Sequence, residues 1–284
     1  GESGRQSEWR ERGATIASLH PLFHPRGVAV IGASRTPGSI GYRLLDALRL
    51  NRFAGRCYAV NPHAGTIAGV EAFPAVRNVP GPVDLAIIAV PKEAVLSVID
   101  ECAAIGVRAL VVITAGFAEV GEQGRQLQDH LLDRVRQHGM RMVGPNCFGI
   151  LNTDPAVRLN ATFTSTFPLA GSIAMSSQSG ALGLALVAAS ERLHLGLSTF
   201  VSVGNKADVS VNDLLQYWEH DAATKVILLY VESFGNPRRF AQIARRVSRN
   251  KPIVVLKAGR TSSGKRAAGS HTAALAANDV AVEA

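Results

Sequence analysis

The sequence has little cysteine, with only Cys57, Cys102 and Cys147 in 284 residues. These three show no Cys-x-x-Cys or Cys/His spacing, which argues against a zinc or disulfide framework and is typical of a reducing compartment. No run of about 18 uncharged apolar residues occurs, so no transmembrane helix is expected. The first 20 residues are polar and charged and lack the apolar stretch of a secretory signal. We therefore predict a cytoplasmic protein that does not span a membrane.

Aromatic residues are also scarce, at 6% of the chain, and they do not interleave with basic ones. Lys and Arg exceed Asp and Glu, giving a formal net charge of +8. The basic residues are dispersed, with short clusters at Arg238 and Arg239 and at Arg245 and Arg246. A solvated helix face explains such clusters, so no nucleic acid partner is expected. The excess of positive charge instead suits a small polyanion that carries phosphate groups.

What the sequence does contain is an alternation of short apolar runs with longer amphipathic segments. This pattern predicts buried parallel strands joined by crossover helices, and therefore an α/β domain over residues 20–150. A polar linker is expected before it, at residues 1–19. The expected strands are 28–34, 56–60, 84–90, 109–116 and 141–145, and the expected helices are 40–51, 92–106 and 122–139.

The alternation breaks at residues 151–170, where Thr, Asn and Pro occur without helical periodicity, and we interpret this segment as an interdomain crossover. The pattern then restarts, so a second doubly wound parallel domain is predicted over residues 171–284. Four strands make a thin sheet, and we expect the full protein to add at least one more element beyond Ala284. The expected strands are 171–177, 197–204, 225–233 and 252–259, and the expected helices are 181–193, 211–220 and 236–250.

In an open parallel sheet, ligands bind beyond the carboxyl ends of the strands, so the loops there are candidate sites. The loop at 32–41, GASRTPGSIG, has glycines between a strand and a helix, where backbone N–H groups can approach a pyrophosphate. A tight turn without a ligand is the alternative. The loop is longer than the GxGxxG motif and contains Pro37. Asn61 occupies the position at the end of the second strand where NAD-binding folds have an acidic residue for the ribose. An NAD-dependent dehydrogenase is therefore disfavoured, whereas another nucleotide is not.

Two further loops stand out in the second half of the chain. Ser177, Gln178 and Ser179 directly precede a helix, either as a simple cap or as a phosphoryl site at the positive end of the helix dipole. His271 lies in a long loop of small residues after the last strand, and a solvated polar side chain is its ordinary interpretation. A neutral imidazole is also a good nucleophile toward phosphorus, and Glu232, at a neighbouring strand end, would orient it.

Seven motifs together resemble those of the NDP-forming acyl-CoA synthetases, the superfamily of succinyl-CoA synthetase and ADP-forming acetyl-CoA synthetase. In family order they are PRGVAVIGAS, VNP, ITAGF, GPNCFGI, SSQSGALG, SVGNKADV and GSHTAALA. The resemblance covers residues 20–284. It implies a Rossmann-like CoA-binding domain followed by a flavodoxin-like domain that carries a phosphorylated histidine.

By this resemblance, His271 is the phosphohistidine and Glu232 is the glutamate that steadies it. The residues that the resemblance assigns to the phosphate site are Ser177, Gln178, Ser179 and Gly180. Those that it assigns to CoA are Gly32, Ser34, Arg35, Pro37, Gly38, Asn61, Pro62, Val90, Pro91, Ile113 and Thr114. The sequence departs from its relatives at two places, with His63-Ala64 where many have a lysine after VNP, and with Ala273 where the acetyl-CoA type has glycine after SHT.

The family reaction exchanges acyl-CoA, NDP and phosphate with acid, CoA and NTP through an acyl phosphate and a phosphohistidine. The resemblance implies CoA or acyl-CoA as the ligand, and ATP or ADP with Mg at an ATP-grasp domain or subunit. No ATP-grasp sequence is present, so the chain alone is not expected to complete the cycle. A homo-oligomer is expected, and no metal site within the chain.

Two alternatives stay open at the level of the sequence. In one, the chain is a non-catalytic acyl-CoA-sensing region of a protein acetyltransferase, fused to a GNAT domain; in the other, it is a different nucleotide-binding Rossmann protein. Retention of His271 and Glu232 favours the enzyme, because a pure sensor needs no phosphoryl acceptor.

Overall fold

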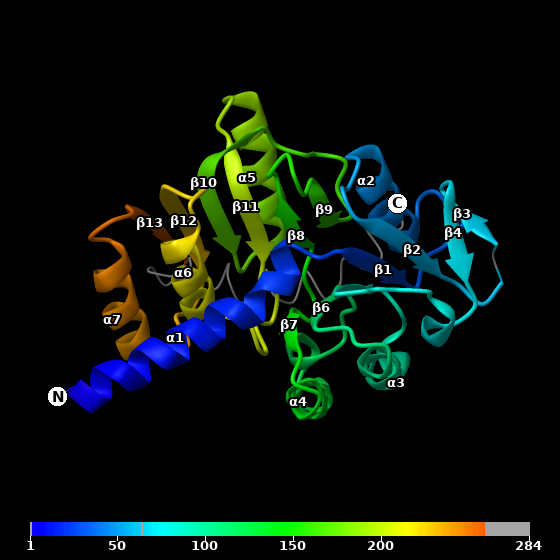
Figure 1. The fold of residues 1–284 in the computed structure, drawn as a ribbon, viewed down its shortest axis with the longest axis horizontal. Helices are drawn as coiled ribbons and strands as arrows, with labels where there is room; N and C mark the ends of the chain where they lie inside the picture. The colour runs from blue at the N-terminus through cyan, green and yellow to red at the C-terminus, as the bar shows by residue number, and fades with distance from the viewer. Residues whose placement is uncertain (1, 64, 259–284) are drawn as a thin grey trace.

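The first half of the protein forms a seven-stranded sheet, in a computed structural model that describes residues 2–63 and 65–258 (Figure 1). The strand order is β3-β4-β2-β1-β5-β6-β7, and every pair is parallel except β3 with β4. From β4 to β7 this is the 3-2-1-4-5-6 order of the Rossmann fold, as the resemblance implied. The strands are β1 (Gly27–Ile31), β2 (Arg56–Val60), β3 (Thr66–Ile67), β4 (Val70–Phe73), β5 (Leu85–Ile88), β6 (Ala109–Val112) and β7 (Arg141–Val143).

Three helices cover this sheet, and all three lie where the sequence predicts them. They are α2 (Ile40–Leu50), α3 (Lys92–Ala104) and α4 (Glu122–Gln137). Figure 1 shows α2 on one face of the sheet and α3 and α4 on the other. Accordingly, Leu44 of α2 belongs to one hydrophobic cluster, whereas Ile99 of α3 and Leu131 of α4 belong to another. Two short 3-10 turns, Val76–Asn78 and Ala118–Val120, complete this half.

The second half forms a six-stranded sheet in the order β13-β12-β10-β11-β8-β9. The four strands from β10 to β13 are parallel to one another, as predicted. Met175 of β10 and Val187 of α5 share the cluster on one face, whereas Ala174, Leu214 of α6 and Val247 of α7 share the cluster on the other. The elements are β8 (Gly149–Asn152), β9 (Leu159–Thr162), β10 (Ala170–Ser177), α5 (Gly180–Arg192), β11 (Leu197–Ser202), α6 (Val211–His220), β12 (Val226–Val231), α7 (Pro237–Val247) and β13 (Ile253–Lys257).

Three segments differ from the sequence-based expectation. The first is the antiparallel pair β3 and β4, at residues 66–73, where no strand was predicted. The expected crossover at residues 151–170 contains the second half of β8 and all of β9. β8 pairs antiparallel with β11, and β9 pairs antiparallel with β8, so both strands extend the second sheet. In the expected linker at residues 1–19, the described residues 2–19 are helical and belong to α1 (Glu2–Phe23). Its last turns hold fully buried Leu19, Leu22 and Phe23, which explains why the helix is retained against the body of the protein.

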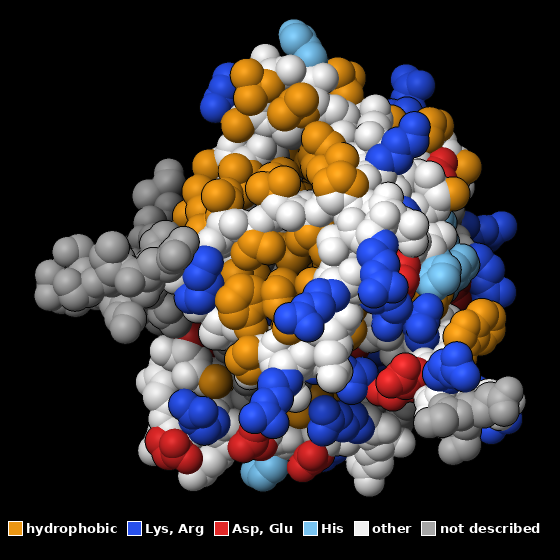
Figure 2. All heavy atoms as spheres, turned by 90° about the vertical axis from the view of Figure 1, so that its left-hand side faces the viewer, with side chains coloured by type: hydrophobic (Ala, Val, Ile, Leu, Met, Phe, Trp, Pro, Cys, Tyr) orange, Lys and Arg blue, Asp and Glu red, His pale blue; other side chains and the backbone are white. Residues whose placement is uncertain are grey.

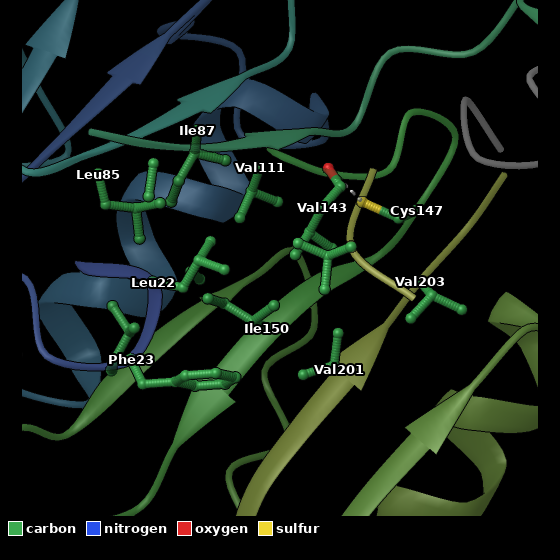
Figure 3. Close-up of a cluster of buried hydrophobic side chains, with 14 of the residues drawn as sticks. Leu22, Phe23, Leu85, Ile87, Val111, Val143, Cys147, Ile150, Val201 and Val203 are labelled. Carbon is green, nitrogen blue, oxygen red and sulfur yellow. Dashed lines mark hydrogen bonds between the residues drawn. The ribbon is translucent and has the colours of Figure 1, made fainter. Parts of the chain in front are cut away.

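One hydrophobic cluster is continuous between the two sheets (Figure 3). It joins Leu85 and Val111 of the first sheet to Ile150 and Val201 of the second, with Leu22 of α1 between them. The side-chain amide of Asn152 adds a hydrogen bond of 2.8 Å to the carbonyl oxygen of Phe23. The carboxyl ends of the two sheets are therefore held in a fixed relation by a shared core.

A polar network reinforces this junction. The guanidinium of Arg141, at the start of β7, donates at 3.0 Å to Asp208 and at 3.0 Å to Asp213, and at 2.9 Å to the hydroxyl of Ser18. Asp208 lies in the loop before α6, Asp213 in α6 and Ser18 in α1. Because the three side chains of the ion pairs are at least four-fifths buried, removing one partner would leave an uncompensated buried charge and cost more than breaking a surface pair.

The outer edge of the second sheet exposes apolar side chains. Val254, Val255 and Leu256 of β13 are 49%, 37% and 45% exposed among the described residues. Figure 2 views the molecule from the side on which β13 and α7 lie, and apolar side chains gather on that side. Within residues 2–63 and 65–258, no helix combines the length and the apolar character needed to cross a bilayer.

Candidate functional site

A cavity of about 620 Å³ lies at the carboxyl ends of β1, β5 and β6. Its walls come from the loops that follow these three strands and from the first turns of α2 and α3. β1 lies between β2 and β5, where the strand order reverses, and open α/β sheets bind ligands at this switch point. The volume is in the range of pockets that hold drug-sized ligands.

The loop after β1 stands close to its neighbours because two glycines leave room. Gly32 has φ +94°, and a Cβ there would lie 2.3 Å from the carbonyl oxygen of Ala89. A Cβ on Gly41 would lie 2.0 Å from the carbonyl oxygen of Gly32. Ser39 caps α2 by accepting the backbone N–H of Tyr42 at 3.2 Å. The loop thus brings the N-terminus of α2, where the helix dipole is positive, to the cavity wall.

Most of the residues assigned to CoA meet in this cavity. Its lining includes Gly32, Ser34, Gly38, Val90, Pro91, Ile113 and Thr114. The hydroxyl of Thr114 donates at 2.7 Å to the carbonyl oxygen of Val90, so the loops after β5 and β6 are tied together inside the wall. The structure therefore brings together residues that are up to 82 positions apart in the sequence, from Gly32 to Thr114.

The other four assigned residues, Arg35, Pro37, Asn61 and Pro62, do not line the cavity. The side chain of Asn61 donates at 2.8 Å to the carbonyl oxygen of Ala33. The guanidinium of Arg35 donates to the carbonyl oxygen of His63. These bonds fasten the loop after β2 to the loop after β1, and a direct contact of the four residues with a ligand stays a prediction.

Sequence reasoning missed one cation of the cavity. Lys92, the first residue of α3, lines it, whereas His63 stands after β2, where many relatives have a lysine. The motif VPK, at the end of β5, was the available signal, because it puts a lysine one position beyond Pro91. Lys92 thus gives the cavity a positively charged side chain from the loop after β5.

The second group of predicted residues also comes together, because β10 and β12 are adjacent strands. The side-chain oxygen of Gln178 accepts the backbone N–H of Glu232 and, at 2.9 Å, that of Ser233. The hydroxyl of Ser177 donates at 2.6 Å to the carbonyl oxygen of Ser179, whose own hydroxyl caps α5 by accepting the N–H of Leu182. The start of α5 and the residue that carries the carboxylate are therefore held side by side.

Gly180 shows how the first half of the chain contributes to this site. A Cβ on Gly180 would lie 2.1 Å from a ring carbon of Phe148, which belongs to the GPNCFGI motif. The backbone N–H of Phe148 donates at 3.0 Å to the hydroxyl of Ser202, at the end of β11. The glycine is required because the aromatic ring packs directly against the first turn of α5.

Two lysines contact the same strand end. Lys257, at the end of β13, donates at 2.6 Å to the carbonyl oxygen of Glu232. Lys206, in the SVGNKADV motif, donates at 2.8 Å to the carbonyl oxygen and at 2.7 Å to the hydroxyl of Ser233. Burial lowers the pKa of Lys206, Glu232 raises it and Lys257 lowers it further, so the three charges interact.

His271 and the neighbouring Thr272 and Ala273 lie outside the described residues, so the approach of His271 to Glu232 stays a prediction. The three cysteines are free thiols, and burial raises the pKa of each to about 12. Among the described residues, no group of three or more His, Cys, Asp or Glu side chains is arranged to hold a metal ion.

Comparisons with known proteins agree with this architecture. The family model of the CoA binding domain matches residues 26–153, and that of the succinyl-CoA ligase like flavodoxin domain matches residues 170–284. The fold and the cavity thus define a CoA-binding domain joined to a ligase-type flavodoxin domain. The chain belongs to the NDP-forming acyl-CoA synthetase superfamily.

Two similar proteins are ADP-forming acetate–CoA ligases. The alpha subunit of ADP-forming acetate–CoA ligase I from Pyrococcus furiosus is 45% identical over 266 residues, which are 92% of this chain and 57% of the subunit. The ADP-forming acetate–CoA ligase of Methanocaldococcus jannaschii is 42% identical over 94% of this chain and 37% of its own length. The chain thus spans little more than half of the subunit that it matches.

A solved structure supports the fold. The dinucleotide forming acetyl-coenzyme A synthetase 1 of Ca. Korarchaeum cryptofilum, in complex with phosphate and ADP, superimposes with a TM-score of 0.84 at 47% sequence identity. The match covers 90% of this chain and 55% of that chain.

Proposed function

We propose that this chain is the CoA-binding and phosphohistidine-bearing portion of an NDP-forming acyl-CoA synthetase. One observation carries the proposal: seven of the eleven residues assigned to CoA line one cavity at the switch point of the first sheet. The acetate–CoA ligases among the relatives support a small carboxylic acid as the substrate.

The residues of the cavity fit CoA by their chemistry. The N-terminus of α2 and the ammonium of Lys92 offer N–H donors and positive charge to the phosphate groups of CoA. Val90, Pro91 and Ile113 provide apolar walls for the uncharged parts of the ligand. CoA supplies the thiol that carries the acyl group as a thioester.

The reaction that we propose has three steps. An oxygen of inorganic phosphate attacks the thioester carbonyl carbon, the C–S bond breaks, and acyl phosphate and CoA thiolate are formed. A ring nitrogen of His271 then attacks the phosphorus of acyl phosphate, the P–O bond to the acyl group breaks, and the carboxylate leaves. Finally an oxygen of NDP attacks the phosphorus, the P–N bond breaks, and NTP is formed. Glu232 would hold the imidazole in the orientation and protonation state that this nucleophile needs.

The nucleotide step requires a partner. We propose that an ATP-grasp domain or subunit holds the nucleotide with Mg, and the name of the P. furiosus relative, a subunit alpha, supports a separate chain. A cytoplasmic location, the domain limits at 20–150 and 171–284, a homo-oligomer and the alternative role as an acyl-CoA sensor fused to a GNAT domain stay predictions.

Calorimetry with CoA and with NAD tests the binding half of the proposal. We expect a saturable heat with CoA and none with NAD. Binding of NAD without binding of CoA would contradict the assignment of the cavity.

The catalytic half needs the full-length protein. After incubation with ATP, or with acyl-CoA and phosphate, we expect acid-labile phosphate on the protein that disappears in His271→Ala while CoA still binds. A wild-type protein that binds CoA but never becomes phosphorylated would instead support the sensor.

A further inference from the structure

The ammonium groups of Lys206 and Lys257 converge on one dipeptide, Glu232–Ser233. Lys206 comes from the loop after β11 and Lys257 from the end of β13, so they approach from opposite sides of β12 in the sheet. Their partners in this dipeptide are two carbonyl oxygens and a hydroxyl, all uncharged. Lys257 also donates at 2.7 Å to the carbonyl oxygen of Ala258.

Neither lysine forms an ion pair within the described parts of the chain. Both side chains are half-buried, and a cation that loses water without a counterion raises the free energy of the folded state. Glu232 is close enough to raise the pKa of Lys206, but two positive charges face one negative charge. Among the described residues, Lys206 and Lys257 together therefore carry one more positive charge than Glu232 balances, and an anion would neutralise it.

Gln178 brings hydrogen-bond donors to the same dipeptide, Glu232–Ser233. Its side-chain oxygen is fixed as an acceptor because it receives the N–H groups of both Glu232 and Ser233. The amide nitrogen of Gln178 must then lie on the other branch of the side chain, and it has no partner in the described residues. Two N–H donors of this nitrogen stay available directly before α5.

We propose that Lys206 and Lys257, together with the side-chain amide of Gln178, bind the phosphate oxyanion that is passed to His271. This inference rests on the proposed function and deepens it, because the resemblance assigned no role to either lysine. The ligand class is a phosphate, either free or within an acyl phosphate. The two lysines neutralise its charge while their contacts to Glu232 and Ser233 keep the carboxylate in place.

The test measures the affinity of inorganic phosphate for the full-length protein in a His271→Asn background, where no covalent phosphate forms. We expect Lys206→Gln and Lys257→Gln to weaken phosphate binding by about tenfold each, because glutamine can still donate to the carbonyl oxygens but has no charge. We expect Lys206→Arg to retain most of the affinity. The affinity for CoA should be unchanged in all of these variants.

Lys251 provides the matched control. It also donates to two backbone carbonyl oxygens, those of Trp218 and Asp221, and burial also lowers its pKa, but it lies before β13, at the opposite end of the strand from Lys257. Lys251→Gln therefore reports how the loss of an ammonium that bonds two backbone carbonyl oxygens affects folding. We expect it to leave the affinity for phosphate unchanged.

The outcomes separate this inference from the proposed function. Unchanged phosphate affinity in the double variant Lys206→Gln, Lys257→Gln, with CoA still bound, would overturn the inference. The two lysines would then serve only to hydrogen-bond Glu232 and Ser233. Absence of phosphate binding before any lysine is changed would overturn it too. If phosphate binding depends on the lysines but a protein with His271 intact never forms acid-labile phosphate, the oxyanion site stands and the proposed turnover fails.

Discussion

The side-chain oxygen of Gln178 lies 2.9 Å from the backbone nitrogen of Ser233 and also accepts the N–H of Glu232. This contact connects the end of β10, which leads into α5, with the end of β12, which carries the carboxylate. It orients the glutamine amide without using any charged group.

Gln178→Glu tests whether the site receives an anion. A carboxylate of the same size still accepts both backbone N–H groups, but it removes two donors and adds a negative charge beside the start of α5. We expect the rate of phosphohistidine formation in the full-length protein to fall at least about tenfold, since a lost charge-assisted contact is of that order. Calorimetry with CoA is the control and should be unaffected. An unchanged rate would show that no anion binds near Gln178.

Lys92→Gln tests the cation that lines the cavity. If the ammonium of Lys92 contacts a phosphate group of CoA, its loss should weaken CoA binding by about tenfold and reduce the dependence of the affinity on salt. Lys225→Gln is a suitable control, because Lys225 is exposed and lies directly before β12 in the second sheet. Equal CoA affinities of the Lys92 and Lys225 variants would show that Lys92 does not contribute to CoA binding.

Gly41→Ala tests the close approach of α2 to the loop after β1. The new Cβ would lie 2.0 Å from the carbonyl oxygen of Gly32, so the helix or the loop must shift. We expect a loss of about 1–3 kcal/mol in the free energy of unfolding and weaker CoA binding. Gly13→Ala, where a Cβ meets no atom within 4 Å, should cause neither change. Denaturant unfolding and calorimetry measure both, and a fully stable, CoA-binding Gly41→Ala would contradict the close packing.

The pairing of Asp84 with Arg26 predicts how the free energy of unfolding depends on pH. Hydrogen bonds from Arg26, at 2.9 Å to each carboxylate oxygen, hold the pKa of Asp84 below its ordinary value. The stabilisation is therefore fully present above the unfolded-state pKa of about 3.9 and is lost as pH falls through the lower folded-state pKa. We expect Asp84→Asn to lower the free energy of unfolding at pH 7 by about 1–3 kcal/mol, and the difference to shrink in strong acid.

Asp46→Asn is the comparison for that experiment. Asp46 pairs with Arg49 on the surface of α2, where both side chains are more exposed than Asp84. Such a pair contributes about 0–1 kcal/mol, so its loss should be small at every pH. If the two variants lose equal stability at pH 7, the buried carboxylate of Asp84 has no special role.

The parallel strands and their helices were predictable because each fills its position with apolar residues. β5 and β6, for example, are fully buried and read as LAII and ALVV. β9 was missed because it buries polar side chains: Asn160 and Thr162 are both inaccessible to solvent, and the hydroxyl of Thr162 donates to Asn160 at 2.6 Å. Buried polar side chains that satisfy each other's hydrogen bonds allow a strand to be buried without apolar residues. Such a strand cannot be found from a hydrophobic pattern.

The candidate site was predictable where topology alone decides it. Parallel strands put their carboxyl ends at one edge, so Gly32, Val90 and Thr114 were expected to meet. Lys206 and Lys257 were not, because their role depends on which atoms their long side chains reach across β12. These contacts join strands that are distant in the sequence, so the spacing of residues within a motif cannot predict them.

The core that joins the two sheets through Leu22 and Phe23 affects how such a chain can be inherited. α1 comes first in the sequence, yet its last turns pack between elements of both halves. A recombination event that replaced only one half would leave these side chains against a foreign surface, with cavities or clashes as the result. Selection should therefore keep the N-terminal helix and both sheets together as one inherited block, however freely the regions outside it are exchanged.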